Sequence, residues 1–410
     1  MLLSSLSREA QLLLLTAGPA TTEARIRELV TSDLNWQLIA ALAAGAKAAP
    51  TVLKRVDEAT DGRTPAAARK RLQPLAMVTQ FRQVRLEECF LEVVEKLAPG
   101  NCDGVLLKGA ALAVTVYDSF AERPMGDIDV LLSPSAAARV QQELLGAGWK
   151  EEYLSDPDLE HHARRQHFYQ DHHHLPPLID PSGAGAVVEL HTDVCPPGHP
   201  FQGQAAGMWE RARRADYGGR PVLVPDPADL LLHLCLHFAW SHLMLTGGWR
   251  TFRDINALDE AGVIDWPRFL GNAESARGLT CCYWTLRMAR SLTGLVVPDE
   301  ILEALRPPLP AAVLDKVERH LAHEIIPSER ICPSVRVRRR VWEIAFRPGW
   351  SGHGWVRPWL VSGAEPSFER AHAAKGLRKS WDTIRRIPHL KNYFSALLSS
   401  RATGTASRLG

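Results

Sequence analysis

The hydrophobic pattern of this chain changes twice along its length, and these changes constrain the fold more than any other feature. Helical periodicity dominates the first hundred residues and includes one long predicted helix from about Ala66 to Leu97. From Gly104 onward, short apolar runs alternate with glycine turns and helical segments, and helical patterns return after Pro225. A sheet is therefore expected only between about residues 100 and 195, inside a chain that is otherwise helical.

Three strands are predicted in this middle part, at residues 105–107, 126–132 and 186–191. The first ends at Lys108-Gly109, which is followed by a helix rich in small residues. The second leads into a helix that begins at Ser133-Pro134-Ser135, where a serine and a proline mark a helix start. Strands that alternate with helices predict an α/β or α+β domain.

Caps and apolar spacing define the helices of the first hundred residues. Asp33 is the predicted N-cap of a helix that carries Trp36 and ends at Gly45. In the long helix, apolar residues at helical spacing predict one buried face. These residues are Leu72, Leu75, Phe81, Val84, Phe90 and Val94.

The composition and the cysteines indicate the class of protein and its compartment. Apolar residues make up 46% of the chain, which is enough to offset the entropy lost on ordering, and the net charge of +2 gives no general argument for nucleic acid or membrane binding. The seven cysteines are irregularly spaced without a CxxC pair, so neither a disulfide framework nor a zinc ribbon is predicted. The run Leu12–Leu15 is too short for a secretory signal, and no stretch approaches the roughly 18 apolar residues of a membrane span. We therefore expect a reduced, cytoplasmic protein.

The chemically informative residues lie on the second and third predicted strands. Residues two apart on a strand point to the same side, so Asp127 and Asp129 share one face, as do Glu189 and His191. Two carboxylates a few ångströms apart repel each other, and a divalent cation such as Mg²⁺ relieves this repulsion while leaving positions for phosphate oxygens. If the two strands are neighbours, Glu189 becomes a third carboxylate at the same metal site.

An anion site is predicted where the first strand ends. Because Lys108-Gly109 ends a strand and opens a helix, free backbone N–H groups and the helix N-terminus can receive a phosphate. A glycine there lets the phosphate approach the backbone closely. The chain has no GxxxxGK[ST] or GxGxxG pattern, which excludes a P-loop or a Rossmann interpretation.

These motifs also carry a resemblance to known proteins. The segments LLKGAAL, RPMGDIDVLL and VVELH resemble the DNA polymerase β-like nucleotidyltransferase superfamily. More narrowly, the chain is similar to the bacterial uncharacterised nucleotidyltransferase family, with its LKG, RxxxDID and acid-x-His pattern. The resemblance is strongest over residues 101–260, where it includes LLLHLCLHFAWSHL followed by Trp249-Arg250 and Arg253-Asp254-Ile255.

The resemblance implies an α+β fold, with a small mixed-sheet nucleotidyltransferase core flanked by an N-terminal helical region and C-terminal helices. The expected boundaries are a helical region at 1–100, the core at 101–225, a helical domain at 226–330 and a basic segment rich in Trp and Arg at 331–410.

The resemblance also implies transfer of a nucleotidyl group from an NTP to an acceptor hydroxyl by a two-metal mechanism that uses Mg²⁺ or Mn²⁺. Asp127, Asp129 and Glu189 would be catalytic and hold the metals, Glu189 would help to deprotonate the acceptor, and His191 would orient these ligands. The nucleotide would be bound by Lys108, Gly109, Ala110 and Arg123. The acceptor stays open among a small molecule, a peptide, a protein and an RNA.

Other functions and simpler roles remain alternatives. The chain could be a catalytically silent module that binds a nucleotide and serves a partner, or a transferase that uses another activated donor; the three acids favour the enzyme. Arg123 meets a phosphate or pairs with Glu122, and we favour the phosphate. His233 and His237 lie one helical turn apart, but their apolar neighbours indicate core histidines with satisfied hydrogen bonds.

Histidines between residues 161 and 174 suggest a zinc site. No cysteine or acid accompanies them at zincin spacing, so a solvated loop is predicted instead. These residues are His161, His162, His167, His172, His173 and His174.

The charge is unevenly distributed along the chain. Residues 333–410 contain 15 Lys and Arg but 4 Asp and Glu, a net charge of +11, whereas residues 1–332 carry −9. Five tryptophans are interleaved with the basic residues, a mixture that suits nucleic acid through phosphate contacts and stacking. The alternative, which the number of tryptophans favours, is that this segment docks on the acidic remainder and closes the nucleotide site. The tryptophans are Trp342, Trp350, Trp355, Trp359 and Trp381.

Overall fold

The computed structural model describes residues 2–97, 104–151, 173–183, 185–195, 201, 204–242 and 244–326. The basic segment at 331–410, with its predicted contacts, lies outside the described residues. The N-terminal region is helical, with a 3₁₀ turn before α1 and another before α2. Its helices are α1 (Arg8–Thr16), α2 (Glu23–Val30), α3 (Trp36–Gly45), α4 (Ala49–Ala59) and α5 (Ala66–Leu97). The long helix α5 has the predicted bounds.

The sheet is mixed and has seven strands in the order β3-β4-β5-β2-β1-β7-β6. At its centre, β2 pairs parallel with β5 and antiparallel with β1. The three predicted strands are present as β1, β2 and β5, whereas the β6–β7 hairpin and the short strands β3 and β4 are additions that the sequence analysis does not contain. The strands are β1 (Val105–Leu106), β2 (Asp127–Leu131), β3 (Lys150–Glu151), β4 (Leu178–Ile179), β5 (Val187–His191), β6 (Arg213–Tyr217) and β7 (Arg220–Val224).

Helices connect the strands and continue beyond the sheet. Between the strands lie α6 (Lys108–Thr115), a 3₁₀ turn (Phe120–Glu122), α7 (Pro134–Gly146) and α9 (Gln204–Glu210). After β7 follow α10 (Pro227–Leu236), a π-helical turn (His237–Ser241), α11 (Gly248–Glu260), α12 (Trp266–Ser275), α13 (Leu279–Thr293), α14 (Asp299–Leu305) and α15 (Ala311–Glu324). A mixed sheet with helices before and after it is an α+β fold, as predicted.

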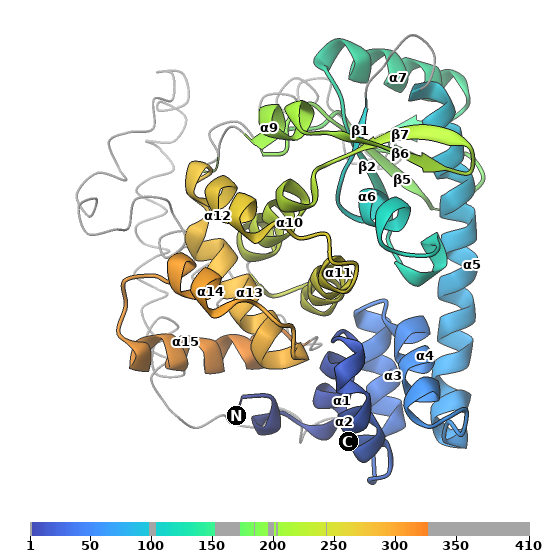
Figure 1. Cartoon of the computed structure of the whole chain (residues 1–410). Coiled ribbons are helices and arrows are strands. Elements are labelled where there is room, and N and C mark those ends of the chain that lie inside the picture. Colours follow the sequence, from blue (N-terminus) through green and yellow to red (C-terminus); the bar gives the residue numbers. More distant parts are fainter. Residues whose placement is uncertain are drawn as a thin grey trace, which may run out of the picture.

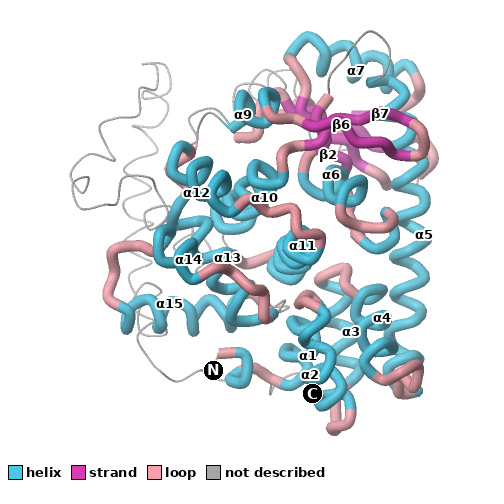
Figure 2. Tube along the Cα trace, viewed as in Figure 1, coloured by secondary structure: helices cyan, strands magenta, loops and turns pink. Residues whose placement is uncertain are grey.

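The strands gather at one end of the molecule, and helices make up the rest (Figure 2). Helix α5 runs along one side and joins the N-terminal helices to the sheet, packing against α3, α4 and α7 (Figure 1). Helix α6 packs on β2, and α10 contacts α6, α11 and α13. The central part of the sheet, where α6 packs on β2, therefore lies near helices from both flanking regions.

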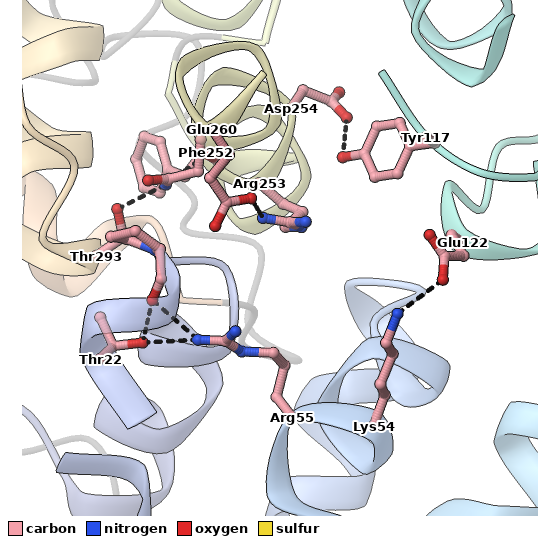
Figure 3. A network of polar contacts seen from close by, with 12 residues as sticks. Thr22, Lys54, Arg55, Tyr117, Glu122, Phe252, Arg253, Asp254, Glu260 and Thr293 are labelled. Carbon is pink, nitrogen blue, oxygen red and sulfur yellow. Dashed lines mark hydrogen bonds and ion pairs between the residues drawn. The ribbon is translucent and has the colours of Figure 1, made fainter. Parts of the chain in front are cut away.

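Polar contacts tie the N-terminal helices and α11 to the segment between α6 and β2 (Figure 3). Lys54 of α4 pairs with Glu122 at 2.8 Å. On the other side, the Tyr117 hydroxyl donates to Asp254 Oδ1 of α11 at 2.9 Å. Both flanking regions are thus attached to the same short segment of the core.

The N-cap predicted for α3 is wrong by two residues. Asn35, which directly precedes the helix, is the cap, and its side-chain oxygen accepts from the backbone N–H of Leu38 at 3.0 Å. Asp33 lies too far before the first helical residue to reach these N–H groups. The helix start predicted at Ser133-Pro134-Ser135 is confirmed, and Ser133 is the N-cap, accepting from the N–H of Ala136.

The apolar face predicted for α5 is only partly buried. Leu72 and Phe90 are fully buried, but Phe81 is 69% and Val84 49% exposed. At this level the inward position is taken by the buried Gln83, whose amide donates to the Met125 carbonyl at 2.9 Å and accepts from its N–H at 3.0 Å. These two hydrogen bonds to the Met125 backbone therefore set the orientation of the helix there, and they turn Phe81 and Val84 outward.

No described helix combines the length and the apolar composition needed to cross a membrane. The described cysteines are free. They are Cys89, Cys195, Cys235, Cys281 and Cys282.

Candidate active site

The site is built where β2 and β5 lie side by side. Their parallel register places Asp129 opposite Glu189, and Leu131 opposite His191. Alternate residues of a strand share a face, so the polar residues of both strands point to one side while the apolar residues between them fill the core. The strands are neighbours, as the argument for Glu189 as a third carboxylate requires.

Lys108 reaches the same group from the start of α6. Leu107 donates its backbone N–H to the carbonyl of Asp129 at 2.9 Å, which places the next residue beside that aspartate. Lys108 has a φ of 45°, in the left-handed region that residues other than glycine rarely occupy. Its Nζ donates to Asp129 Oδ1 at 2.7 Å. An uncommon backbone conformation thus holds this lysine at the carboxylates.

Asp129 is the centre of the polar group. It is buried, and its Oδ1 accepts from Lys108 and lies 2.8 Å from His191 Nε2. Burial alone would raise the pKa of Asp129, but Lys108 and His191 together hold it well below its ordinary value. In the same way, burial would lower the pKa of Lys108, and the surrounding carboxylates raise it instead. The site therefore contains a carboxylate that stays ionised, Asp129, and an ammonium that stays protonated, Lys108.

Asp129, Glu189 and His191 form a group that suits a metal ion. Each offers one ligand atom, and these atoms lie within 4.8 Å of one another. His191 Nε2 is 3.3 Å from Glu189 Oε2, and the role of the imidazole in orienting these ligands stays a prediction. Two carboxylates and an imidazole on adjacent strands fit a divalent cation such as Mn²⁺ or Mg²⁺. Asp127, which the sequence analysis places among the ligands, lies outside this group.

Asp127 starts β2 one position before the apolar Ile128 and has a different environment. The negative charge of Asp129, followed by burial, raises the pKa of Asp127 above its ordinary value. This is the like-charge repulsion expected of two carboxylates on one strand face. An added positive charge near Asp127 would relieve this repulsion.

Arg123 has a partner that the sequence analysis does not contain. Its guanidinium donates from Nε and Nη2 to the two carboxylate oxygens of Asp254, at 3.0 and 2.7 Å, and the pair is buried. The suggested pairing with Glu122 is wrong, because Glu122 binds Lys54 instead. With its carboxylate-facing nitrogens engaged, Arg123 joins the core to α11, and its phosphate contact stays a prediction.

Position 109 has to be a glycine because the Arg123 side chain lies against it. A Cβ atom at this position would lie 2.8 Å from Arg123 Nη1 and 3.1 Å from Met125 Sδ. The glycine therefore makes room for the buried ion pair. The phosphate contacts predicted for Gly109 and Ala110 stay predictions. They are supported by the start of α6, where no side chain caps the free N–H groups.

Histidines surround the polar group, and the sequence analysis missed this. His173 and His174 pack on His191 with ring centroids 5.0 and 5.2 Å away, so for these two residues the predicted solvated loop is wrong. His161, His162, His167 and His172 lie outside the described residues.

His233 is buried, but its Nδ1 has no hydrogen-bond partner, so the expectation of a satisfied core histidine is wrong there. Burial, together with the nearby Lys108, lowers its pKa to about 3. Two signals of this cluster were present in the sequence, the histidine-rich loop and the HLCLH spacing from His233 in α10 to His237 in the turn after it. Nothing in the sequence places the two segments side by side.

A small mixed sheet that presents acids from two parallel strands beside a lysine at a helix start defines a nucleotidyltransferase-type core. The chain belongs to the family described as uncharacterised nucleotidyltransferases, whose model matches residues 32–294. No curated protein and no solved structure shows significant similarity to the chain. Family membership supports nucleotidyl transfer as the general chemistry and an NTP as the substrate.

Proposed function

We propose that the protein transfers a nucleotidyl group from an NTP to an acceptor hydroxyl, using Asp127, Asp129 and Glu189 with a divalent metal. The observation that carries this proposal is the β2–β5 register, which puts Asp129 and Glu189 opposite each other within reach of the Lys108 ammonium. These are the groups needed to bind a metal–phosphate complex and to take up a proton.

Asp129, Glu189 and His191 would hold the divalent cation. When bound, such an ion withdraws negative charge from the phosphates and makes the acceptor hydroxyl easier to deprotonate. A second ion would need Asp127, and the repulsion by Asp129 that raises the pKa of Asp127 supports this placement. Mg²⁺ and Mn²⁺ both accept carboxylate oxygens, and the imidazole favours Mn²⁺.

The chain's own residues supply the remaining functions. Lys108 would donate to an oxygen of the α-phosphate, and the free N–H groups at the start of α6 would bind the same phosphate. Glu189, whose side chain is 23% exposed, is the carboxylate placed to accept the proton of the acceptor hydroxyl. The acceptor oxygen forms a bond to the α-phosphorus, and the bond from that phosphorus to the bridging oxygen breaks. Pyrophosphate leaves with the electron pair.

The experiment is incubation of the protein with each α-labelled NTP, Mg²⁺ or Mn²⁺ and a cell extract. We expect label to enter one class of acceptor and pyrophosphate to appear with it. Asp129→Asn and Glu189→Gln should abolish labelling, whereas the matched variant Glu210→Gln, at an exposed carboxylate away from the site, should retain it.

The alternatives give different results in the same experiment. A silent module would bind an NTP without releasing pyrophosphate. A transferase with another donor would leave every NTP intact.

A further inference from the structure

We propose that Lys47 and Arg250 form the binding site for the β- and γ-phosphates of the donor, so that two cations from the flanking helical regions hold the leaving pyrophosphate. This inference rests on the proposed function, since it names a part of the donor that the same site would bind. Neither residue was singled out as a binding residue from the sequence.

Lys47 lies in the short connection between α3 and α4, next to the start of β2. Its backbone has a φ of 54°, and its Nζ lies so near Gly126 that a Cβ atom there would be only 2.9 Å away. A side chain at position 126 would therefore require the end of the flexible lysine side chain to shift. The glycine before Asp127 lets Lys47 sit over the backbone that leads into the site.

Arg250 approaches from the opposite flanking region, in the first turn of α11. It lies four residues before Asp254 and so on the same side of the helix as the carboxylate that holds Arg123. Its Nε is buried and has no hydrogen-bond partner. A buried guanidinium nitrogen without an acceptor is costly, and an anionic ligand would satisfy it.

The balance of charge around Asp127 favours an anion. Arg123 and Asp254 neutralise each other, which leaves Asp127 as the one carboxylate that interacts electrostatically with both Lys47 and Arg250. Among the described residues, neither cation forms a hydrogen bond or an ion pair. Lys47 is exposed at the surface, but partial burial of its ammonium, followed by the positive charge of Arg250, lowers its pKa below the ordinary value. Two cations that repel each other beside one carboxylate leave room for a further negative group.

The position of the two cations selects the polyphosphate rather than the acceptor. Asp127 interacts with Lys108 as well as with Lys47 and Arg250, so it connects the carboxylate–lysine group to the cation pair. A donor with its α-phosphate at Lys108 can extend past Asp127 and place its terminal phosphates between Lys47 and Arg250. The charge that develops on the leaving pyrophosphate would then be stabilised where it appears.

The framework around the site holds the two cations in place from both sides. Lys47 lies two residues before α4, which Lys54 attaches to Glu122, and Arg250 lies on α11, which Asp254 attaches to Tyr117 (Figure 3). The polyphosphate site would therefore join three parts of the chain: the N-terminal helices, the sheet and α11.

The test measures binding of inorganic tripolyphosphate to the full chain by calorimetry at low salt, without metal. We expect Lys47→Met and Arg250→Met each to weaken binding by about tenfold, because each removes a charge-assisted contact, and the double variant to lose measurable binding. The control Lys150→Met removes an exposed lysine on β3 and should bind as the wild type does. Thermal unfolding shows whether each variant is folded.

The outcomes separate this inference from the proposed function. Tripolyphosphate binding that is absent in the wild type, or unchanged in the folded double variant, would overturn the assignment of Lys47 and Arg250. If tripolyphosphate binding is lost in the variants but the wild type transfers no nucleotide, the polyphosphate site stands and the proposed function fails. If Arg250→Met does not fold, Lys47→Met still decides the case, because Lys47 is exposed and its replacement removes no core packing.

Discussion

The two aspartates of β2 differ in their partners, although their spacing presents them as a pair. Asp129 is buried between Lys108 and His191, whereas Asp127 is mainly repelled by Asp129. Asp129→Asn should lower the free energy of unfolding by about 3 kcal/mol, because it leaves the Lys108 ammonium without its carboxylate. Asp127→Asn should leave it unchanged or slightly higher, because it removes like-charge repulsion. Urea unfolding measures both values.

The variants Asp127→Asn and Asp129→Asn are expected to differ in stability but not in activity. Both variants should lose transfer, since both carboxylates are needed for two metal ions. A fully active Asp127→Asn enzyme at ordinary Mg²⁺ would contradict the two-metal mechanism. Equal stability of the two variants would contradict the central position of Asp129.

Glu189 and His191 are also neighbours with different expected roles. Glu189→Gln removes the group that takes the acceptor proton, so kcat should fall by about 10²–10⁴-fold. His191→Gln keeps a hydrogen-bonding side chain beside Asp129 and should cost about 10–100-fold in metal affinity or activity. Single-turnover rates over a Mn²⁺ titration measure both effects. A dead His191→Gln with an active Glu189→Gln would point to a mechanism centred on the histidine.

At the scale of elements, the ion pair between Arg123 and Asp254 attaches α11 to the core. Both side chains are buried, 7% and 2% exposed. Asp254→Asn should lower the free energy of unfolding by about 3–5 kcal/mol, because the arginine is left buried and unpaired. Replacing both residues, as Arg123→Met with Asp254→Leu, should recover most of that loss. Equilibrium unfolding of Asp254→Asn and of the double variant tests this, and a double variant no more stable than Asp254→Asn would contradict it.

The elements that sequence could predict are those whose signal is local. Helix α5, β2 and β5 each carry a periodicity of their own, and the alternation in β2 and β5 also gave the shared face of Asp129 and Glu189. The strands β3 and β4 have only two residues each. Strand β1 is equally short, but its apolar run ends at Lys108-Gly109 and leads into a helix, which marks it in the sequence. The pairing of β3 and β4 depends on contacts with β5 that the chain makes only after folding.

Contacts between distant segments could not be predicted from one sequence. Arg123 and Asp254 are 131 positions apart, and nothing near Arg123 excludes the adjacent Glu122 as its partner. The exposure of Phe81 has the same cause, because the buried face of α5 is decided by the bonds from Gln83 to Met125. Lys47 likewise shows its proximity to Asp127 only when the N-terminal helices are in place.

At the scale of the whole molecule, the neutral histidines beside the site make stability depend on pH. His233 is fully enclosed, and its pKa is lowered to about 3 first by burial and then by Lys108. An unfolded histidine takes up a proton near pH 6.5, whereas the folded His233 does not, so below that pH the unfolded state binds more protons. The stability contributed by His233 is therefore complete above pH 6.5 and is lost as the pH falls toward 3.

This effect should be measurable in the unfolding of the full chain. Between pH 6 and 5, where most carboxylates are still ionised in both states, each such histidine should contribute a loss approaching about 1.4 kcal/mol per pH unit. His233→Gln should remove its share of that slope, so that the wild-type and variant curves converge as the pH falls. Above pH 7.5 both curves should be flat with respect to this group, which serves as the internal control. Parallel curves from pH 7.5 to 5 would mean that His233 is protonated in the folded protein, and its enclosure beside Lys108 would then have to be wrong.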